Sequence, residues 1–96
     1  MTHSATPLSG KVAVVTGSGQ GLGLAYAQEL ARRGAAVVIN DVDQATADAA
    51  VESIVEAGGR ASAVVAAVGS TETAEALVKG AVEAFGGLDI LLTRAT

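Results

Sequence analysis

Short apolar runs and longer amphipathic stretches alternate along the chain. Residues 11–16 form an apolar run rich in β-branched side chains between Gly10 and Gly17, which is typical of a strand buried on both faces. Similar short runs predict three further strands, at residues 36–40, 61–65 and 88–92. Asp89 stands at the start of the last run, where we expect it to be a structural hydrogen-bond acceptor.

The stretches between these runs have the period of amphipathic helices. The first stretch follows the glycines at 17–23 and ends at Gly34. Its apolar face comprises Leu22, Ala25, Tyr26 and Leu30. We expect this face to be buried, with Tyr26 as a core residue.

Two more helices are predicted, each ended by a glycine pair. Asp43 is a suitable N-cap for the second, and Ser70 or Thr71 for the third. The inward positions of the second are Ala47, Ala50, Val51, Ile54 and Val55. Those of the third are Ala74, Leu77, Val78, Ala81, Val82 and Phe85.

The resulting order, β-α-β-α-β-α-β, predicts an α/β fold with a parallel sheet and right-handed crossovers. We expect residues 1–8 to be a flexible tail and residues 9–96 to form one domain. No apolar run approaches the length of a membrane span, and the N-terminus does not have the pattern of a signal peptide. We therefore expect a cytoplasmic protein.

Composition excludes several classes of function. Half of the 96 residues are hydrophobic and 17% are charged, which is too apolar for a disordered chain. Aromatic residues make up 2% and the net charge is −4, so neither an aromatic stacking platform nor a binder of phosphate backbones is expected. The chain has no Cys and one His, His3, which leaves no metal site to predict.

The glycines between the first strand and the first helix are the main chemical signal. Such a turn lets the backbone approach a ligand, and the helix N-terminus presents unpaired N–H groups to a phosphate or pyrophosphate. Asp41 ends the second strand 18 residues after Gly23, near the spacing of about 20 residues expected for an acid that binds the adenosine ribose. No Gly-Lys-Ser/Thr follows the glycines, which excludes a phosphate loop of the NTP-hydrolysing kind.

The segment Thr16-Gly17-Ser18-Gly19-Gln20-Gly21-Leu22-Gly23 resembles the T-G-x-x-x-G-x-G cofactor motif of the short-chain dehydrogenase/reductase family. The resemblance extends from about Leu8 to Leu92, and it implies a Rossmann-type doubly wound parallel sheet. It also implies that this chain is a truncated half of the full fold, a partial dinucleotide-binding domain.

The resemblance further implies a nicotinamide dinucleotide. Because an acid rather than a cation stands at the ribose position, we expect NAD rather than NADP. By matching position, the expected cofactor-binding residues are Gly17, Ser18, Gln20, Gly21, Leu22, Gly23, Asp41, Val42 and Val68. Ser18, Gln20 and Leu22 would line the pyrophosphate, Asp41 would hold the ribose, and Val42 and Val68 would flank the adenine.

The chain departs from the family pattern in three places. Ala67 replaces the family's Asp near the adenine, and residues 93–96 replace its N-N-A-G segment. The catalytic Ser and Tyr-x-x-x-Lys have no match here, because Tyr26 is the single tyrosine and Leu30 follows it at the lysine spacing. We therefore expect the 96-residue chain alone to be inactive.

Two classes of function remain open. The first is an NAD-dependent oxidoreductase that transfers hydride between the cofactor and a small-molecule alcohol or carbonyl, with a homo-oligomer possible. The alternative is a non-catalytic nucleotide-binding or interaction fragment from a truncated reading frame. A methyltransferase is a weaker third choice, because Val15 and Thr16 stand where such enzymes usually carry an acid before the glycines.

Overall fold

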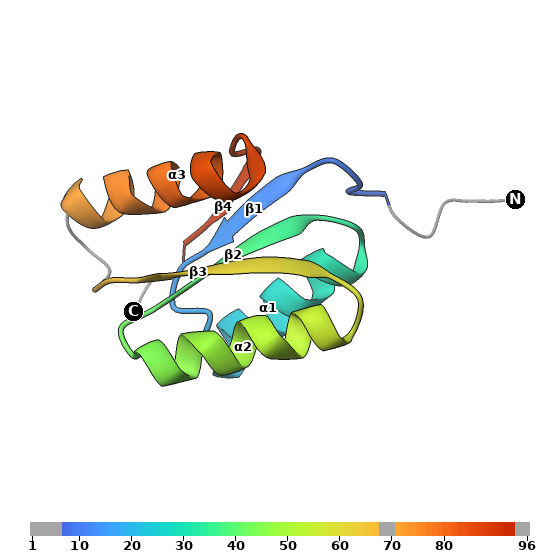
Figure 1. The fold of residues 1–96 in the computed structure, drawn as a ribbon, viewed down its shortest axis with the longest axis horizontal. Helices are drawn as coiled ribbons and strands as arrows, with labels where there is room; N and C mark the ends of the chain where they lie inside the picture. The colour runs from blue at the N-terminus through green and yellow to red at the C-terminus, as the bar shows by residue number, and fades with distance from the viewer. Residues whose placement is uncertain (1–6, 68–70, 94–96) are drawn as a thin grey trace, which may run out of the picture.

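The computed structural model describes residues 7–67 and 71–93, and in these segments strands and helices alternate as the sequence predicts (Figure 1). The strands are β1 (Val12–Val15), β2 (Ala36–Asp41), β3 (Arg60–Val65) and β4 (Ile90–Leu92). The helices are α1 (Gly21–Arg32), α2 (Gln44–Glu56) and α3 (Thr71–Phe85). Thr71 is thus inside α3 rather than its cap, and Ser70 lies outside the described residues.

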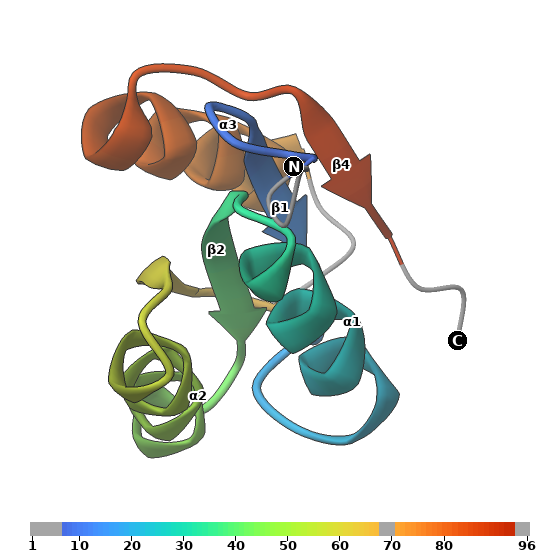
Figure 2. The ribbon, with the colours of Figure 1, turned by 90° about the vertical axis from the view of Figure 1, so that its right-hand side faces the viewer.

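The four strands form one parallel sheet in the order β3-β2-β1-β4. Val14 of β1 lies beside Val38 of β2 on one side and Leu91 of β4 on the other. The chain therefore moves outward from β1 to β3 and then returns across β1 to place β4 at the opposite edge (Figure 2). This reversal confirms the Rossmann-type arrangement and makes the carboxyl ends of β1 and β4 a topological switch point.

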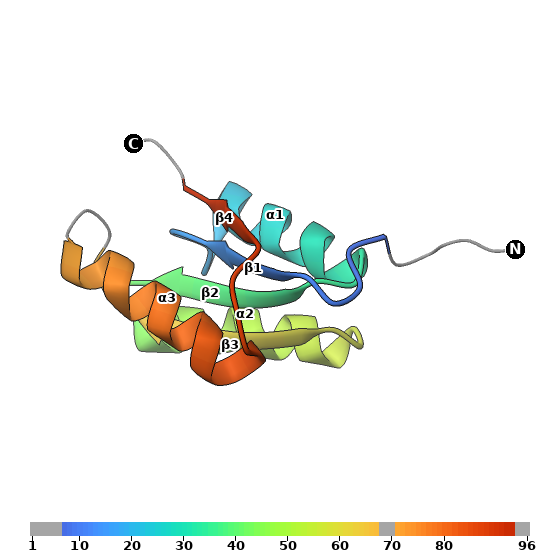
Figure 3. The ribbon, with the colours of Figure 1, turned by 90° about the horizontal axis from the view of Figure 1, so that it is seen from above.

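Helices cover both faces of the sheet, with α1 and α2 on one and α3 on the other (Figures 1 and 3). Alternate residues of β1 and β2 point to opposite faces, and Val14, Val15, Val38 and Ile39 are all fully buried. This explains why both strands are continuous apolar runs.

Helix α1 packs through its small residues, which corrects the expectation for Tyr26. Gly23 and Ala27 are buried against the sheet, whereas Tyr26 is 43% exposed and Leu22 is 54% exposed. A Cβ on Gly23 would collide with the carbonyl oxygen of Gly17, so the missing side chain lets the helix approach the loop closely. This close approach decides which face is inward, and a hydrophobicity pattern does not detect it.

Helix α3 buries less of its apolar face than the sequence predicts. Leu77 and Ala81 are buried as expected, but Val78 and Val82 are 45% and 50% exposed. One helix covers this face of the sheet within the described residues, so the outer half of its apolar stripe has nothing to pack against.

The cap and acceptor predictions for two aspartates are confirmed. Asp43 caps α2 by accepting hydrogen bonds from the Thr46 N–H at 2.9 Å and the Thr46 hydroxyl at 2.6 Å, and these bonds lower the pKa of Asp43. Asp89 accepts from the Val12 N–H at 2.8 Å, while its own N–H donates to the Val12 carbonyl at 2.9 Å. This reciprocal pair fixes the register of β4 against β1.

Leu8, at the predicted end of the tail, is joined to the folded part. Its N–H donates to the Arg33 carbonyl at 2.8 Å, and its side chain packs against the core beneath α1 and α2. Among the described residues, no helix is both long and apolar enough to cross a membrane.

Candidate functional site

The glycine loop lies at the carboxyl end of β1, between the ends of its two neighbouring strands. The Thr16 N–H donates to the Leu92 carbonyl of β4 at 3.0 Å, and the next residues turn toward the end of β2. Gly17 and Gly21 have φ values of +59° and +64°, which side chains other than glycine adopt rarely. These two glycines therefore set the path of the chain into α1.

Three successive N–H groups of the loop donate to the last two residues of β2. The Gly17 N–H donates to the Asn40 side-chain oxygen at 3.2 Å, and the Ser18 N–H donates to the Asn40 carbonyl at 2.7 Å. The Gly19 N–H donates to Asp41 Oδ2 at 3.2 Å. The first half of the loop is therefore held by β2, and its N–H groups point away from the helix start.

Ser18 belongs to this internal network. Its side chain is fully buried, and its hydroxyl donates to the Val15 carbonyl at 2.6 Å and accepts from the Asn40 N–H at 3.0 Å. Its N–H and hydroxyl are thus both engaged within the chain. Ser18 therefore holds the loop to β2 and does not face solvent at the start of α1.

The start of α1 is different, because its first N–H groups are open. Among the hydrogen bonds of the described residues, none has the N–H of Gly21, Leu22 or Gly23 as donor, and Gln20, the N-cap, provides no side-chain cap. Gln20, Gly21 and Leu22 are exposed. Open N–H groups at the positive end of a helix dipole are the arrangement that binds a phosphate or pyrophosphate.

Asp41 stands beside this helix start. Its Oδ1 accepts from the Asp43 N–H at 3.1 Å and its Oδ2 from Gly19, so the carboxylate is oriented by two backbone donors. A Cβ on Gly19 would lie 2.5 Å from Asp41 Oδ2, so glycine is needed there for the carboxylate to approach. Val42 follows and is 67% exposed, whereas Val68 lies outside the described residues.

Asn40 is the site residue that the sequence analysis did not single out. It is fully buried, and its side-chain Nδ2 donates to the carbonyls of Val64 and Ala66 at 3.2 Å and 3.1 Å while its Oδ1 accepts from Gly17. The available signal was a polar residue at the end of an otherwise apolar buried strand. That signal alone does not say which carbonyls the amide would meet.

Two positions that depart from the family pattern lie nearby. The Ala67 carbonyl accepts a hydrogen bond from the Thr73 hydroxyl, which ties the end of β3 to the first turn of α3. Thr93 is exposed after β4, and residues 94–96 lie outside the described residues.

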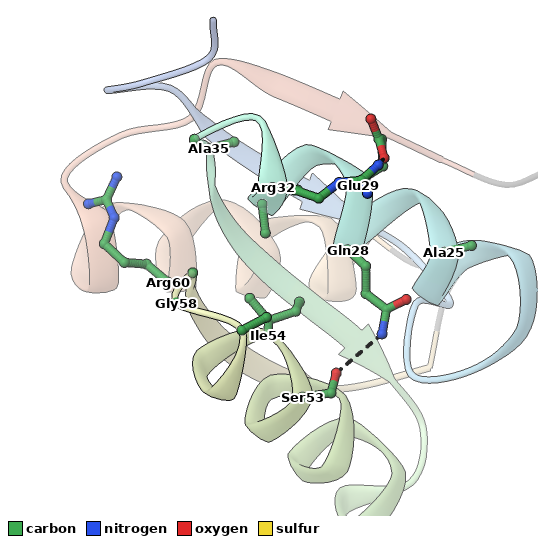
Figure 4. A pocket seen from close by; sticks show the side chains of 13 residues that line it. Ala25, Gln28, Glu29, Arg32, Ala35, Ser53, Ile54, Gly58 and Arg60 are labelled. Carbon is green, nitrogen blue, oxygen red and sulfur yellow. Dashed lines mark hydrogen bonds and ion pairs between the residues drawn. The ribbon is translucent and has the colours of Figure 1, made fainter. Parts of the chain in front are cut away.

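A cavity of 580 Å³ lies elsewhere, between the C-terminal parts of α1 and α2 (Figure 4). The Gln28 amide donates to the Ser53 hydroxyl at 3.4 Å across it, and Arg60 and Ile54 contribute to its wall. Its lining includes none of the residues expected to bind a cofactor. Gly34 and Arg60 place it toward the amino ends of β2 and β3, away from the glycine loop.

Comparisons with known proteins agree with this fold and loop. A family model described as short chain dehydrogenase matches residues 11–96. An uncharacterized oxidoreductase of Methylorubrum extorquens is 52% identical over 89 residues, and a hydroxyacyl-CoA dehydrogenase of Mycobacterium tuberculosis is 48% identical over 99 residues. The crystal structure of a hydroxysteroid dehydrogenase from Escherichia coli superposes with a TM-score of 0.88 at 36% identity.

The chain belongs to the short-chain dehydrogenase family. The matches cover 92%, 98% and 93% of this chain, in the order given above. They cover only 36%, 31% and 38% of the respective relatives, so the chain spans about a third of the length of the proteins it matches.

Proposed function

We propose that this chain is the cofactor-binding part of an NAD-dependent oxidoreductase acting on an alcohol or carbonyl substrate. The observation that carries the proposal is the start of α1, where the open N–H groups of Gly21 and Leu22 lie after a loop fixed by β2. Membership of the short-chain dehydrogenase family supports a nicotinamide dinucleotide as the anion that these groups bind.

Each predicted residue takes a role in this proposal. Gly17, Ser18 and Gly23 shape the loop, because they bind β2 or allow α1 to pack closely. Gln20, Gly21 and Leu22 contact the pyrophosphate at the exposed helix start. Asp41 accepts hydrogen bonds from the adenosine ribose hydroxyls. Val42, and Val68 by its matching position, contact the adenine.

The preference for NAD over NADP is argued from charge. The 2′-phosphate of NADP would approach the Asp41 carboxylate, and two like charges about 4 Å apart at an effective dielectric near 20 repel by about 4 kcal/mol before solvent screening. No Lys or Arg occurs between Lys11 and Arg32, so the loop carries no cation to offset this repulsion. The bound cofactor would supply hydride transfer, whereas this chain would bind and orient its adenosine and pyrophosphate parts.

Calorimetric titration of the purified chain with NADH tests the proposal. We expect saturable one-to-one binding and, with secondary alcohols present, no formation of NADH from NAD, because no acid/base pair of the family pattern is in this sequence. Absence of binding by a folded chain would contradict the proposal and favour the alternative of an interaction fragment.

A further inference from the structure

We propose that Asn40 is a positioning residue for the cofactor site, which fixes the glycine loop by joining the carboxyl ends of β1, β2 and β3 through one buried amide. This inference rests on the proposed function, because the loop it positions leads into the open N–H groups at the start of α1. Asn40 would contact no part of the cofactor itself and would act through Gly17 and Ser18.

The chemistry of the three partners makes an amide specific at this position. The Gly17 N–H can only donate, and the carbonyls of Val64 and Ala66 can only accept. The side chain must therefore offer one acceptor and two donors within the length of an Asn. Leucine has a similar shape and offers neither, and an ionised aspartate offers acceptors only.

Burial makes these bonds consequential. Asn40 is fully buried and Gly17 is half-buried, so loss of the Asn40 oxygen removes a hydrogen bond that is partly shielded from water. The backbone of Asn40 adds two more bonds to the loop, since its carbonyl accepts from the Ser18 N–H and its N–H donates to the Ser18 hydroxyl. Asn40 thus engages two loop residues and two residues at the end of β3.

Asn40 affects ligand binding because the glycine loop is adjacent to both the start of α1 and Asp41. The loop runs from Gly17 directly into α1, and Gly19 donates to Asp41, the residue after Asn40. A shift of Gly17 therefore moves both the first turn of α1 and the donor that orients the Asp41 carboxylate. Removing the Asn40 amide should reduce affinity for the pyrophosphate and ribose together.

The test compares wild type with Asn40→Leu and Asn40→Asp, using ADP-ribose as the probe because it contains the adenosine and pyrophosphate of the cofactor and lacks the nicotinamide. Calorimetry at pH 7.5 should show a loss of affinity of about tenfold or more in both variants. At pH 5.5 Asn40→Asp should regain affinity relative to wild type, because a protonated carboxyl accepts from Gly17 and donates to one carbonyl. Asn40→Leu should show no such recovery.

Controls separate positioning from general stability. Ile54→Val removes one methylene from the buried core beneath α2 and should leave ADP-ribose affinity within twofold of wild type. Asp41, the next titratable residue along β2, is present in every variant, so only position 40 distinguishes their pH responses. Circular dichroism identifies variants that fail to fold. If Asn40→Leu does not fold, the regained ADP-ribose affinity of Asn40→Asp at pH 5.5 is the measurement that decides.

Hydrogen exchange of the Gly17 amide, followed by NMR, tests the inference without a ligand. We expect a protected Gly17 N–H in wild type and Ile54→Val and faster exchange in Asn40→Asp at pH 7.5. Folded Asn40 variants that bind ADP-ribose as wild type does, or a Gly17 N–H unprotected in wild type, would overturn the positioning role. Protection lost in Asn40→Asp while wild type fails to bind ADP-ribose would support the link to the loop and contradict the proposed function instead.

Discussion

The Gly19 N–H donates to the Asp41 carboxylate at 3.2 Å, so the loop that leads to the proposed pyrophosphate site also orients the acid proposed for the ribose. A side chain at position 19 would collide with Asp41 and with the Thr46 methyl, so Gly19 can lie this close to Asp41 because it has no side chain. The two halves of the proposed adenosine diphosphate site are therefore coupled by one hydrogen bond. Substitutions of Asp41 should change loop geometry as well as charge.

This coupling makes Asp41→Asn a sharper test of cofactor preference than Asp41→Ala. Asparagine retains a side-chain oxygen that can accept from Gly19 but has no negative charge. A half-screened repulsion of about 2 kcal/mol corresponds to more than a tenfold preference of wild type for NADH over NADPH. We expect Asp41→Asn to lower the ratio of the NADPH dissociation constant to the NADH dissociation constant in calorimetric titrations with both cofactors.

Asp41→Ala should narrow the ratio too, with weaker binding of both cofactors because Gly19 loses its acceptor. Asp41→Ala combined with Val42→Arg should reverse the preference, since an arginine beside the ribose can pair with the 2′-phosphate. An unchanged ratio in Asp41→Asn would show that the carboxylate does not face the ribose.

The contact between Gly23 and Gly17 predicts that Gly23→Ala impairs the site. The added methyl would collide with the Gly17 carbonyl, which forces α1 away from the loop and costs about 1–3 kcal/mol of unfolding free energy. NADH affinity should fall because the first turn of α1 moves. Gly87→Ala is the matched control, since a Cβ there meets nothing within 4 Å, and equal urea-denaturation midpoints for the two variants would refute the steric argument.

The cap of α2 predicts a stability difference that depends on pH. Hydrogen bonds from Thr46 lower the pKa of Asp43, so the ionised form stabilises the fold at neutral pH. This contribution should be lost as pH falls through the lowered pKa, in the acid range below about 4. Asp43→Ala should therefore melt at a lower temperature than wild type at pH 7, and the gap should shrink toward pH 3.

Thermal melts of wild type, Asp43→Ala and Glu52→Ala across that range provide the measurement. Glu52 is exposed on the same helix and forms none of the capping bonds, so its removal should not reproduce the pH-dependent gap. A gap for Asp43→Ala that stays constant from pH 7 to pH 3 would mean that the ionised carboxylate is not what stabilises the cap.

The exposed edge of β4 predicts self-association of the purified chain. Leu91 is 56% exposed at the edge of the sheet, and Val78 and Val82 add apolar surface on α3. Apolar edge strands pair readily with other chains, and a lysine at such an edge opposes pairing. Light scattering should detect oligomers in wild type and a shift toward monomer in Leu91→Lys, while a strictly monomeric wild type would contradict this expectation.

The sequence pattern was sufficient for the order of strands and helices, because buried parallel strands and amphipathic helices have different periods. It was not sufficient for the inward face of α1, where Tyr26 is more hydrophobic than Gly23 and yet lies outside. Close packing of a glycine against the Gly17 carbonyl decided that face, and such a contact depends on tertiary structure.

In the candidate site too, the sequence predicts some residues and not others. The glycines and Asp41 are recognisable because their spacing matches a known loop. Asn40 is not recognisable, because its role depends on the carbonyls of Val64 and Ala66, which lie at and just after the end of β3, 24 and 26 residues later in the chain. Ser18 has its place for the same reason, since its hydroxyl meets a residue of the neighbouring strand.

An NMR titration of the ¹⁵N-labelled chain with NADH tests most directly whether the start of α1 and Asp41 bind the cofactor. We expect the largest amide shifts at Gly21 and Leu22, at the open start of α1, and at Asp41, the acid proposed for the ribose. If these amides are unchanged and the shifts occur instead around Gln28 and Arg60, in the cavity between α1 and α2, the proposed position of the cofactor is contradicted.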